Sequence, residues 1–232
     1  MHIHELEGCR LVVQDTPWQF ALDHEAAIAR YWSAAITKNP KIFNGEVFVV
    51  ERWSIDNDVL VGQSVSTKFA AYLFWRDGAA DPGPYSEAFA TALVQSQDGG
   101  VLLAQSVEGT LNAGLYGAPG GLLDARDVET DGGFDLAGAA TRELAEETGL
   151  TSAELKRQPG FVLAQVGPFL GVASVFRSHL TGDELLHRVE AFLDTQADPE
   201  LVAPRVIYDV AELDPLALTP FGRLLTTHVL GM

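Results

Sequence analysis

Apolar residues recur with the period of an α-helix in several stretches and form short β-type runs elsewhere. The helical spacing and the end signals predict four helices, at residues 24–38, 135–148, 183–194 and 220–230. Asp23 is suited to cap the first of these, and Gly149 to end the second. The β-rich runs predict strands at residues 42–55, 60–75, 89–95, 101–105, 161–180 with a break at Gly167-Pro168, and 206–210.

The order of these elements favours an α+β fold over a parallel doubly wound sheet, because hairpins and helices are mixed along the chain. The stretch from Asp77 to Pro84 is rich in glycine and proline and is the best candidate for a boundary. We therefore expect a smaller α+β N-terminal region at residues 1–84 and a second domain at residues 85–232.

Composition narrows the functional classes. The formal net charge of −17 repels a phosphate backbone, so nucleic-acid polymers and anionic membranes are poor partners. No apolar run reaches the roughly 18 residues that a membrane span needs. The single cysteine, Cys9, excludes an internal disulfide and fits a cytoplasmic protein.

The segment from Arg142 to Leu150 carries the strongest chemical signal. On a helix, Glu143, Glu146 and Glu147 stand at i, i+3 and i+4, so their carboxylates share one face. The same face carries no lysine, whereas a solvated acidic helix would normally intersperse some. A cluster of carboxylate oxygens is what Mg²⁺ or Mn²⁺ requires.

This segment resembles the second half of the Nudix box: Arg-Glu, an apolar residue, any residue, Glu-Glu, any residue, Gly and an apolar residue. Ala118-Pro119-Gly120-Gly121 resembles the glycine pair that opens the box. The resemblance implies a Nudix-type α/β/α sandwich with a mixed sheet. It also implies a metal-dependent hydrolase that cleaves a diphosphate bond.

The residue roles implied by the resemblance are these. Mg²⁺ or Mn²⁺ is held by Glu143, Glu146, Glu147 and the carbonyl of Gly121. Glu146 and Glu147 serve catalysis, and Arg142 aligns the glutamates by charge-assisted hydrogen bonds.

The box departs from the family pattern at two points. Gly121 stands 21 positions before Arg142, where the family has 14, so seven residues are inserted. The family also has a glutamate eight positions before the arginine, and this chain has Phe134 there. Asp135 is adjacent, and Asp124 or Asp127 could reach back from the insertion.

Three further residues are candidates outside the box. Glu200 precedes the strand predicted at 206–210, where many Nudix enzymes carry an additional metal ligand or base. Arg52 and Arg76, at the ends of N-terminal β runs, are candidates for binding phosphate. For each, an ordinary solvated side chain is the competing interpretation.

The expected partner is a small nucleoside diphosphate derivative. An inserted box that opens with Pro-Gly-Gly is similar to the branch that includes peroxisomal coenzyme A diphosphatases. The stretch from Asn39 to Gly45 resembles the lead-in of Nudix proteins that act on UDP-sugars. A coenzyme A derivative, a nucleotide sugar and ADP-ribose therefore all stay open, as does a homodimer. The alternative is a non-catalytic Nudix scaffold that binds a nucleotide or a protein.

Overall fold

The computed structural model describes residues 1–78, 80–81 and 83–231. Its α-helices are α1 (Gln19–Asp23), α2 (Glu25–Lys38), α3 (Phe69–Arg76), α4 (Leu136–Thr148), α5 (Gly182–Leu193) and α6 (Pro220–Leu230). Its strands are β1 (His2–Leu6), β2 (Gly8–Gln14), β3 (Glu46–Asp56), β4 (Val59–Lys68), β5 (Glu87–Gln95), β6 (Val101–Ser106), β7 (Tyr116–Gly117), β8 (Gly120–Leu122), β9 (Leu155–Arg157), β10 (Phe161–Val166), β11 (Phe169–Ser178) and β12 (Leu201–Ile207). Two 3₁₀ helices are η1 (Ala125–Asp127) and η2 (Val210–Leu213).

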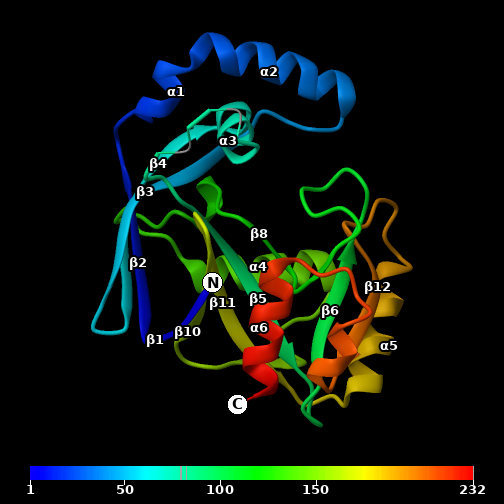
Figure 1. The fold of residues 1–232 in the computed structure, drawn as a ribbon. Helices are drawn as coiled ribbons and strands as arrows, with labels where there is room; N and C mark the ends of the chain where they lie inside the picture. Colours follow the sequence, from blue (N-terminus) through cyan, green and yellow to red (C-terminus); the bar gives the residue numbers. More distant parts are fainter. Residues whose placement is uncertain (79, 82, 232) are drawn as a thin grey trace.

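The larger sheet is mixed and lies between two layers of helices (Figure 1). Its central order is β1-β10-β11-β5-β6-β12, in which β11 and β5 run parallel and the other pairs are antiparallel. Alternate residues of β5 serve opposite faces: Ala90 packs with Leu144 of α4, and Leu93 packs with Leu225 of α6. The expected α+β sandwich with a mixed sheet is confirmed.

The N-terminal region has a sheet and an apolar core of its own. Strand β2 pairs in parallel with β4, which pairs antiparallel with β3. Trp18, which precedes α1, and Tyr72 and Trp75 of α3 are buried in this core. The region also joins the larger sheet, because β1 pairs with β10. The division at residue 84 therefore separates two sets of elements that are joined by the pairing of β1 with β10. The domain boundary stays a prediction.

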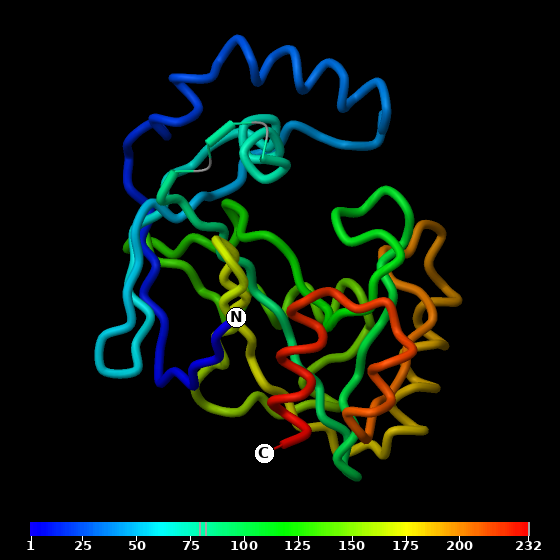
Figure 2. Tube along the Cα trace, in the orientation of Figure 1, coloured from blue at the N-terminus to red at the C-terminus, as the bar shows by residue number. Residues whose placement is uncertain are grey.

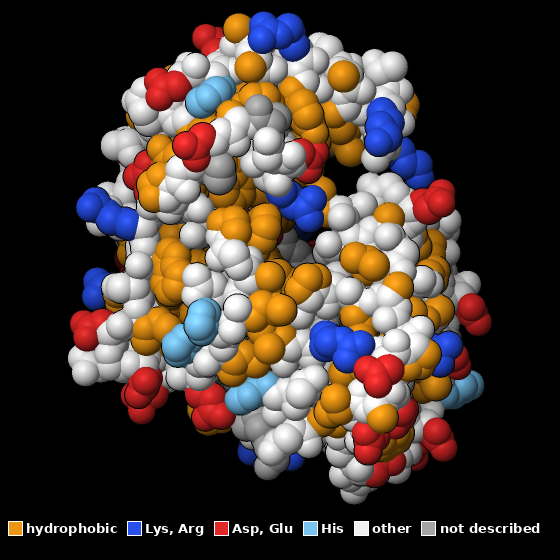
Figure 3. Space-filling view, in the orientation of Figure 1, with side chains coloured by type: hydrophobic (Ala, Val, Ile, Leu, Met, Phe, Trp, Pro, Cys, Tyr) orange, Lys and Arg blue, Asp and Glu red, His pale blue; other side chains and the backbone are white. Residues whose placement is uncertain are grey.

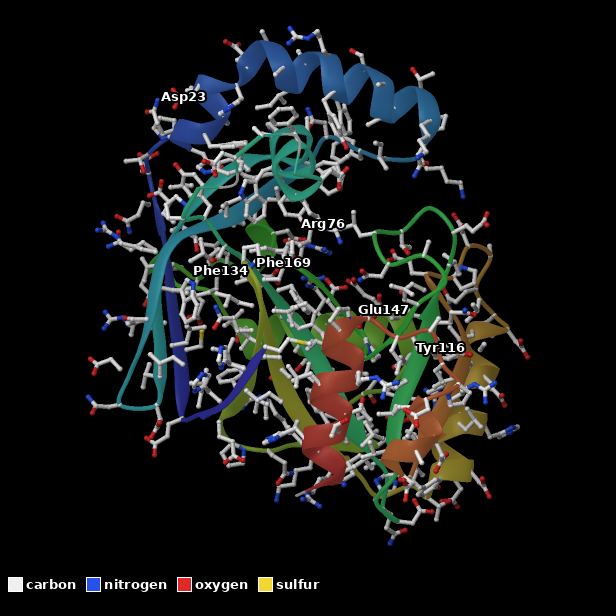
Figure 4. The ribbon with its side chains drawn as sticks, in the orientation of Figure 1. Asp23, Arg76, Tyr116, Phe134, Glu147 and Phe169 are labelled. Atoms are coloured by element: carbon white, nitrogen blue, oxygen red, sulfur yellow. The ribbon has the colours of Figure 1, made fainter. Side chains whose placement is uncertain are left out.

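The structure corrects three of the predicted elements. The strand expected at 206–210 begins earlier, because β12 spans Leu201–Ile207 and Val210 begins η2. Residues 60–75 do not form one strand: β4 ends at Lys68 and α3 follows. An apolar run of this kind is compatible with a buried helix as well as with a strand, and α3 is buried on most sides. Asp23 (Figure 4) does not cap α2, because it is the last residue of α1, and His24 holds the N-cap position without a side-chain hydrogen bond to that helix.

Helix α4 has the predicted limits. The Asp135 side chain accepts a hydrogen bond from the N–H of Gly138, and Gly149 ends the helix with φ of 69°. A Cβ at Gly149 would lie 2.3 Å from the Phe192 ring, so a side chain is excluded by space as well as by conformation. The buried side of α4 fixes the direction in which its three glutamates point. None of the helices formed by the described residues is long and apolar enough to cross a membrane.

We expect the two sets of elements to unfold together, because strands of the N-terminal region also contribute side chains to the apolar core beneath α4. Leu11 of β2 is fully buried among residues that pack with α4. Leu11→Ala should lower the free energy of unfolding by about 2–5 kcal/mol in urea titrations followed by circular dichroism. Leu22→Ala is the control, because Leu22 is 56% exposed, and it should change that free energy by less than about 0.5 kcal/mol. A separate transition left unchanged by Leu11→Ala would contradict the shared core.

Candidate active site

The site begins where two neighbouring strands separate. Strands β5 and β6 are joined by a tight turn and run antiparallel. They pair at one position only, Gln95 with Val101, and then separate. Beyond that pair, β8 lies against β5 and β7 lies against β6. The segment from Tyr116 to Leu122 therefore fills the gap between the separated strands and brings its backbone next to α4.

Two glycines make this close approach possible. A Cβ at Gly120 would lie 2.4 Å from the carbonyl oxygen of Ala90, and a Cβ at Gly121 would lie 2.7 Å from Cδ of Glu143. At Gly120 the obstacle is the backbone of β5, so only glycine lets β8 lie this close to β5. At Gly121 a Cβ would push the Glu143 carboxylate out of its present place.

Glu147 is the acidic residue that reaches the gap. The N–H of Gly120 donates a hydrogen bond to its Oε2 at 2.9 Å. Burial raises the pKa of Glu147 from 4.5 to about 8; the Gly120 N–H opposes this shift, and the charges of Glu143, Glu200 and Glu146 add to it. The site is therefore short of positive charge.

The other two box glutamates lie along the same helix. The Glu143 side chain is mostly buried and accepts a hydrogen bond from Arg142 at 2.5 Å, and burial raises its pKa. The side chain of Glu146 is 53% exposed and lies 3.3 Å from Arg142 and 3.5 Å from Arg126. Glu147 therefore lies at the gap between the strands, Glu143 is mostly buried beside Arg142, and Glu146 lies at the surface.

Arg142 is held by an aspartate of the insertion. Its Nη2 donates to both carboxylate oxygens of Asp127, at 2.8 and 3.0 Å, and Asp127 is 4% exposed. Asp124 instead caps η1, and Asp135 caps α4. Of the aspartates near the insertion, Asp127 is therefore the one that reaches back to Arg142, in place of a glutamate eight positions before that arginine. Phe134 stands at that position and packs edge-on against Phe48 in the core.

A large cleft runs from this acidic end to the N-terminal helices, with a volume of about 1850 Å³. Glu147, Glu200 and the Gly120-Gly121 backbone line one end of the cleft. At the other end its walls come from α2 and α3, and Figure 3 shows a hollow below these helices with hydrophobic side chains around it. The loop after β6 rises toward the end of α2 (Figure 2), where the Asn39 side chain donates to the carbonyl of Gly109.

The structure brings together most of the residues that the sequence singled out. Glu200 lines the cleft, and its charge acts on Glu143 and Glu147. Arg76 also lines it and extends from α3 toward the sheet (Figure 4). Arg52 lies outside the residues that line the cleft, and its guanidinium donates to the Gln63 side chain at 2.8 and 2.5 Å.

The donor set fits a divalent cation. Carboxylates of Glu147 and Glu200 line the acidic end, whereas Glu143 and Glu146 lie outside the cleft lining on the same helix. Carboxylate oxygens are ligands that Mg²⁺ and Mn²⁺ prefer. Burial and neighbouring glutamates raise the pKa of Glu147, because no positive charge among the described residues balances its carboxylate. A divalent cation would supply that positive charge. Across the described part of the chain, no three His, Cys, Asp or Glu side chains already surround a common point as a ligand group. Arg142 holds Glu143 in the conformation seen here.

Comparison with known proteins gives one family. The model of the NUDIX domain matches residues 85–228. A search among curated proteins finds no match. Similar solved structures include the Nudix hydrolase RenU from M. smegmatis, at 17% identity and a TM-score of 0.40, covering 62% of this chain and 82% of that one. A MutT protein from Methanosarcina mazei has 20% identity and a TM-score of 0.42, covering 62% and 92%. The NUDIX domain of Shewanella oneidensis NrtR, solved with ADP ribose, has 19% identity and a TM-score of 0.40, covering 69% and 96%.

Asp127→Asn tests the link between the insertion and the acidic helix. We expect it to lower the free energy of unfolding by about 1–3 kcal/mol, because Arg142 keeps Glu143 and Glu146 but loses the most buried of its three charged partners. Asp131→Asn is the matched control in the same insertion, because Asp131 is exposed and asparagine can keep its bond to the N–H of Gly133. Equal stability of the two variants in urea would show that Asp127 does not hold Arg142.

The pKa of Glu147 predicts how the stability of the metal-free protein depends on pH. The folded state keeps this proton up to about pH 8, whereas the unfolded chain releases it near pH 4.5. The free energy of unfolding should therefore fall as pH rises across this window, by at most about 1.4 kcal/mol per pH unit. Glu147→Gln removes this contribution, and Glu190→Gln, at an exposed position of α5, should keep it. Urea titrations with chelator at pH 5 and pH 8 measure the difference, and parallel behaviour of parent and Glu147→Gln would refute the raised pKa.

Proposed function

Because the chain belongs to the Nudix family, we propose that it uses Mg²⁺ or Mn²⁺ to cleave the diphosphate bond of a nucleoside diphosphate linked to a second group. Nudix hydrolases act on pyrophosphate bonds and generally use divalent metal ions. The observation that carries the proposal is the placement of Glu147, Glu200 and the Gly120-Gly121 backbone at one end of the cleft.

We assign the metal ligands to the acidic end of the cleft. Glu143, Glu146, Glu147 and the carbonyl of Gly121 would hold the ion, with Glu200 as an additional ligand or base. When bound, a divalent ion draws charge from the diphosphate oxygens and makes water acidic enough to attack phosphorus at neutral pH.

The remaining roles follow from the contacts of the side chains. The Gly120 N–H fixes Oε2 of Glu147, so the other oxygen of that carboxylate is the one free to turn to the substrate or to take up a proton. Arg142 does not line the cleft; it holds Glu143 and is itself held by Asp127. We therefore assign Arg142 to positioning rather than to substrate contact.

The size of the cleft supports a substrate with groups on both sides of the diphosphate. Typical small-molecule pockets measure about 300–1,000 Å³, and this cleft is larger, at about 1850 Å³. A nucleotide sugar, a coenzyme A derivative and ADP-ribose are the classes we propose to test. Helices α2 and α3 wall the cleft, so the N-terminal region contributes to the choice among them.

Charge removal at the box glutamates tests the catalytic assignment. Glu146→Gln and Glu147→Gln should each lower turnover on the identified diphosphate by about 100-fold or more, because each removes a charge needed at the phosphoryl centre. Glu190→Gln should keep the parent rate. The assay screens diphosphate compounds with Mg²⁺ or Mn²⁺, identifies both products, and is repeated with excess chelator, which should abolish turnover. Parent rates in both glutamine variants would favour the non-catalytic scaffold.

A further inference from the structure

Strand β5 lines the cleft with alternate residues along much of its length. Its odd residues Thr91, Phe89 and Glu87 all line the cleft, whereas its even residues pack toward α4. Thr91 lies beside Gly120 at the acidic end. Since a strand rises about 3.3 Å per residue, Glu87 lies roughly 13 Å from Thr91, beyond the length of a diphosphate. The strand thus leads from the acidic end to a second polar position.

Glu87 is an unusual residue for that position. It is 6% exposed, and the hydroxyl of Tyr72 donates a hydrogen bond to its Oε2. Burial raises the pKa of Glu87, while the Tyr72 bond and the charge of Arg76 lower it. A buried carboxylate is costly unless its lone pairs are used, yet nothing in the acidic site described above requires this one.

Arg76 lies close enough to act on Glu87 without pairing with it. Both side chains line the cleft, and neither forms a salt bridge with any other described residue. Tyr72 and Arg76 stand at i and i+4 on α3, so this helix brings both groups to the start of β5. A hydrogen-bond acceptor and a guanidinium are therefore presented side by side.

Aromatic rings flank the two polar groups. Phe169 of β11 is the register partner of Glu87, and Phe89 is the next residue of β5 on the same face as Glu87. Both are partly exposed and line the cleft. Partly exposed phenyl faces beside a polar pair suit a flat or ring-shaped group that carries hydrogen-bonding atoms at its edge.

We propose that Glu87 and Arg76 form a specificity subsite for the group beyond the diphosphate. The group is a ring that gives a hydroxyl or N–H to Glu87 and an acceptor oxygen or nitrogen to Arg76. This inference rests on the proposed function for the identity of the diphosphate. The same chemistry is offered by a sugar and by a nucleobase. Sites that hydrogen-bond a substrate hydroxyl or N–H reject analogues lacking it by factors on the order of 10⁴, so the pair is sufficient to set selectivity.

The test uses two variants with matched controls. Glu87→Gln keeps an oxygen for the Tyr72 hydroxyl but replaces the other oxygen with a donor, and Arg76→Gln removes the charge at a partly exposed position. Glu190→Gln and Arg177→Gln make the same changes on exposed surface. Melting temperatures are compared first, and Arg76→Gln carries the test if Glu87→Gln does not fold.

The probes are UDP-glucose, ADP-ribose and coenzyme A with Mg²⁺, and calorimetric binding of UMP, AMP and glucose 1-phosphate. We expect kcat/KM on the preferred diphosphate to fall about 100-fold in each variant, mainly through KM, and the preference among the three compounds to shrink. Loss of mononucleotide binding places the nucleobase at the subsite, and loss of glucose 1-phosphate binding places the sugar there.

Two results would overturn the subsite. One is unchanged KM and unchanged binding in both variants, and the other is an equal fall of kcat on all compounds with the preference intact. If the parent binds these probes but hydrolyses none of them, the proposed function fails. The subsite is then judged by binding alone: weaker binding in both variants supports it, and parent affinity contradicts it.

Discussion

The gap between β5 and β6 is the feature on which the rest of the site depends. Two neighbouring strands that separate after one residue pair leave backbone donors and acceptors that have to be satisfied. The segment from Tyr116 to Leu122 satisfies them by pairing with both strands. Gly120 and Gly121 let this backbone lie against α4, and the Gly120 N–H donates a hydrogen bond to the Glu147 carboxylate. A Cβ at Gly120 would collide with the backbone of β5, and one at Gly121 would displace the Glu143 carboxylate.

The second constraint is electrostatic. Burial raises the pKa of Glu143 and of Glu147, and the charges of Glu146 and Glu200 add to both shifts in a protein that carries a net charge of −17. The positive charge of Arg142 offsets part of this repulsion. The position of the Arg142 side chain is fixed by its ion pair with Asp127 as well as by Glu143. The arrangement costs stability in the absence of a cation and favours binding one. Acidic residues that served only solubility would not be partly buried on one helix face, as Glu143 and Glu147 are.

Much of the fold and of the site could be predicted from local signals. Helix α4 was limited by Asp135 and Gly149, whose roles depend only on neighbouring backbone, and its three glutamates follow from helical spacing. Signals that depend on tertiary packing failed. The apolar run after Lys68 did not distinguish a strand from the buried helix α3. Asp127 was one of three aspartates near the insertion, and only the folded loop selects it. Glu87 gave no signal, because a lone glutamate at the start of a strand is usually solvated.

Anomalous diffraction from crystals grown with Mn²⁺ tests the central claim most directly, because it locates the ion without relying on turnover. We predict an Mn²⁺ peak about 2.1 Å from carboxylate oxygens of Glu147 and Glu143 and from the carbonyl oxygen of Gly121, at the acidic end of the cleft. Glu143 would then have turned away from Arg142. Mn²⁺ bound only at exposed acidic residues elsewhere, with the box glutamates still facing Arg142 at saturating metal, would contradict the account.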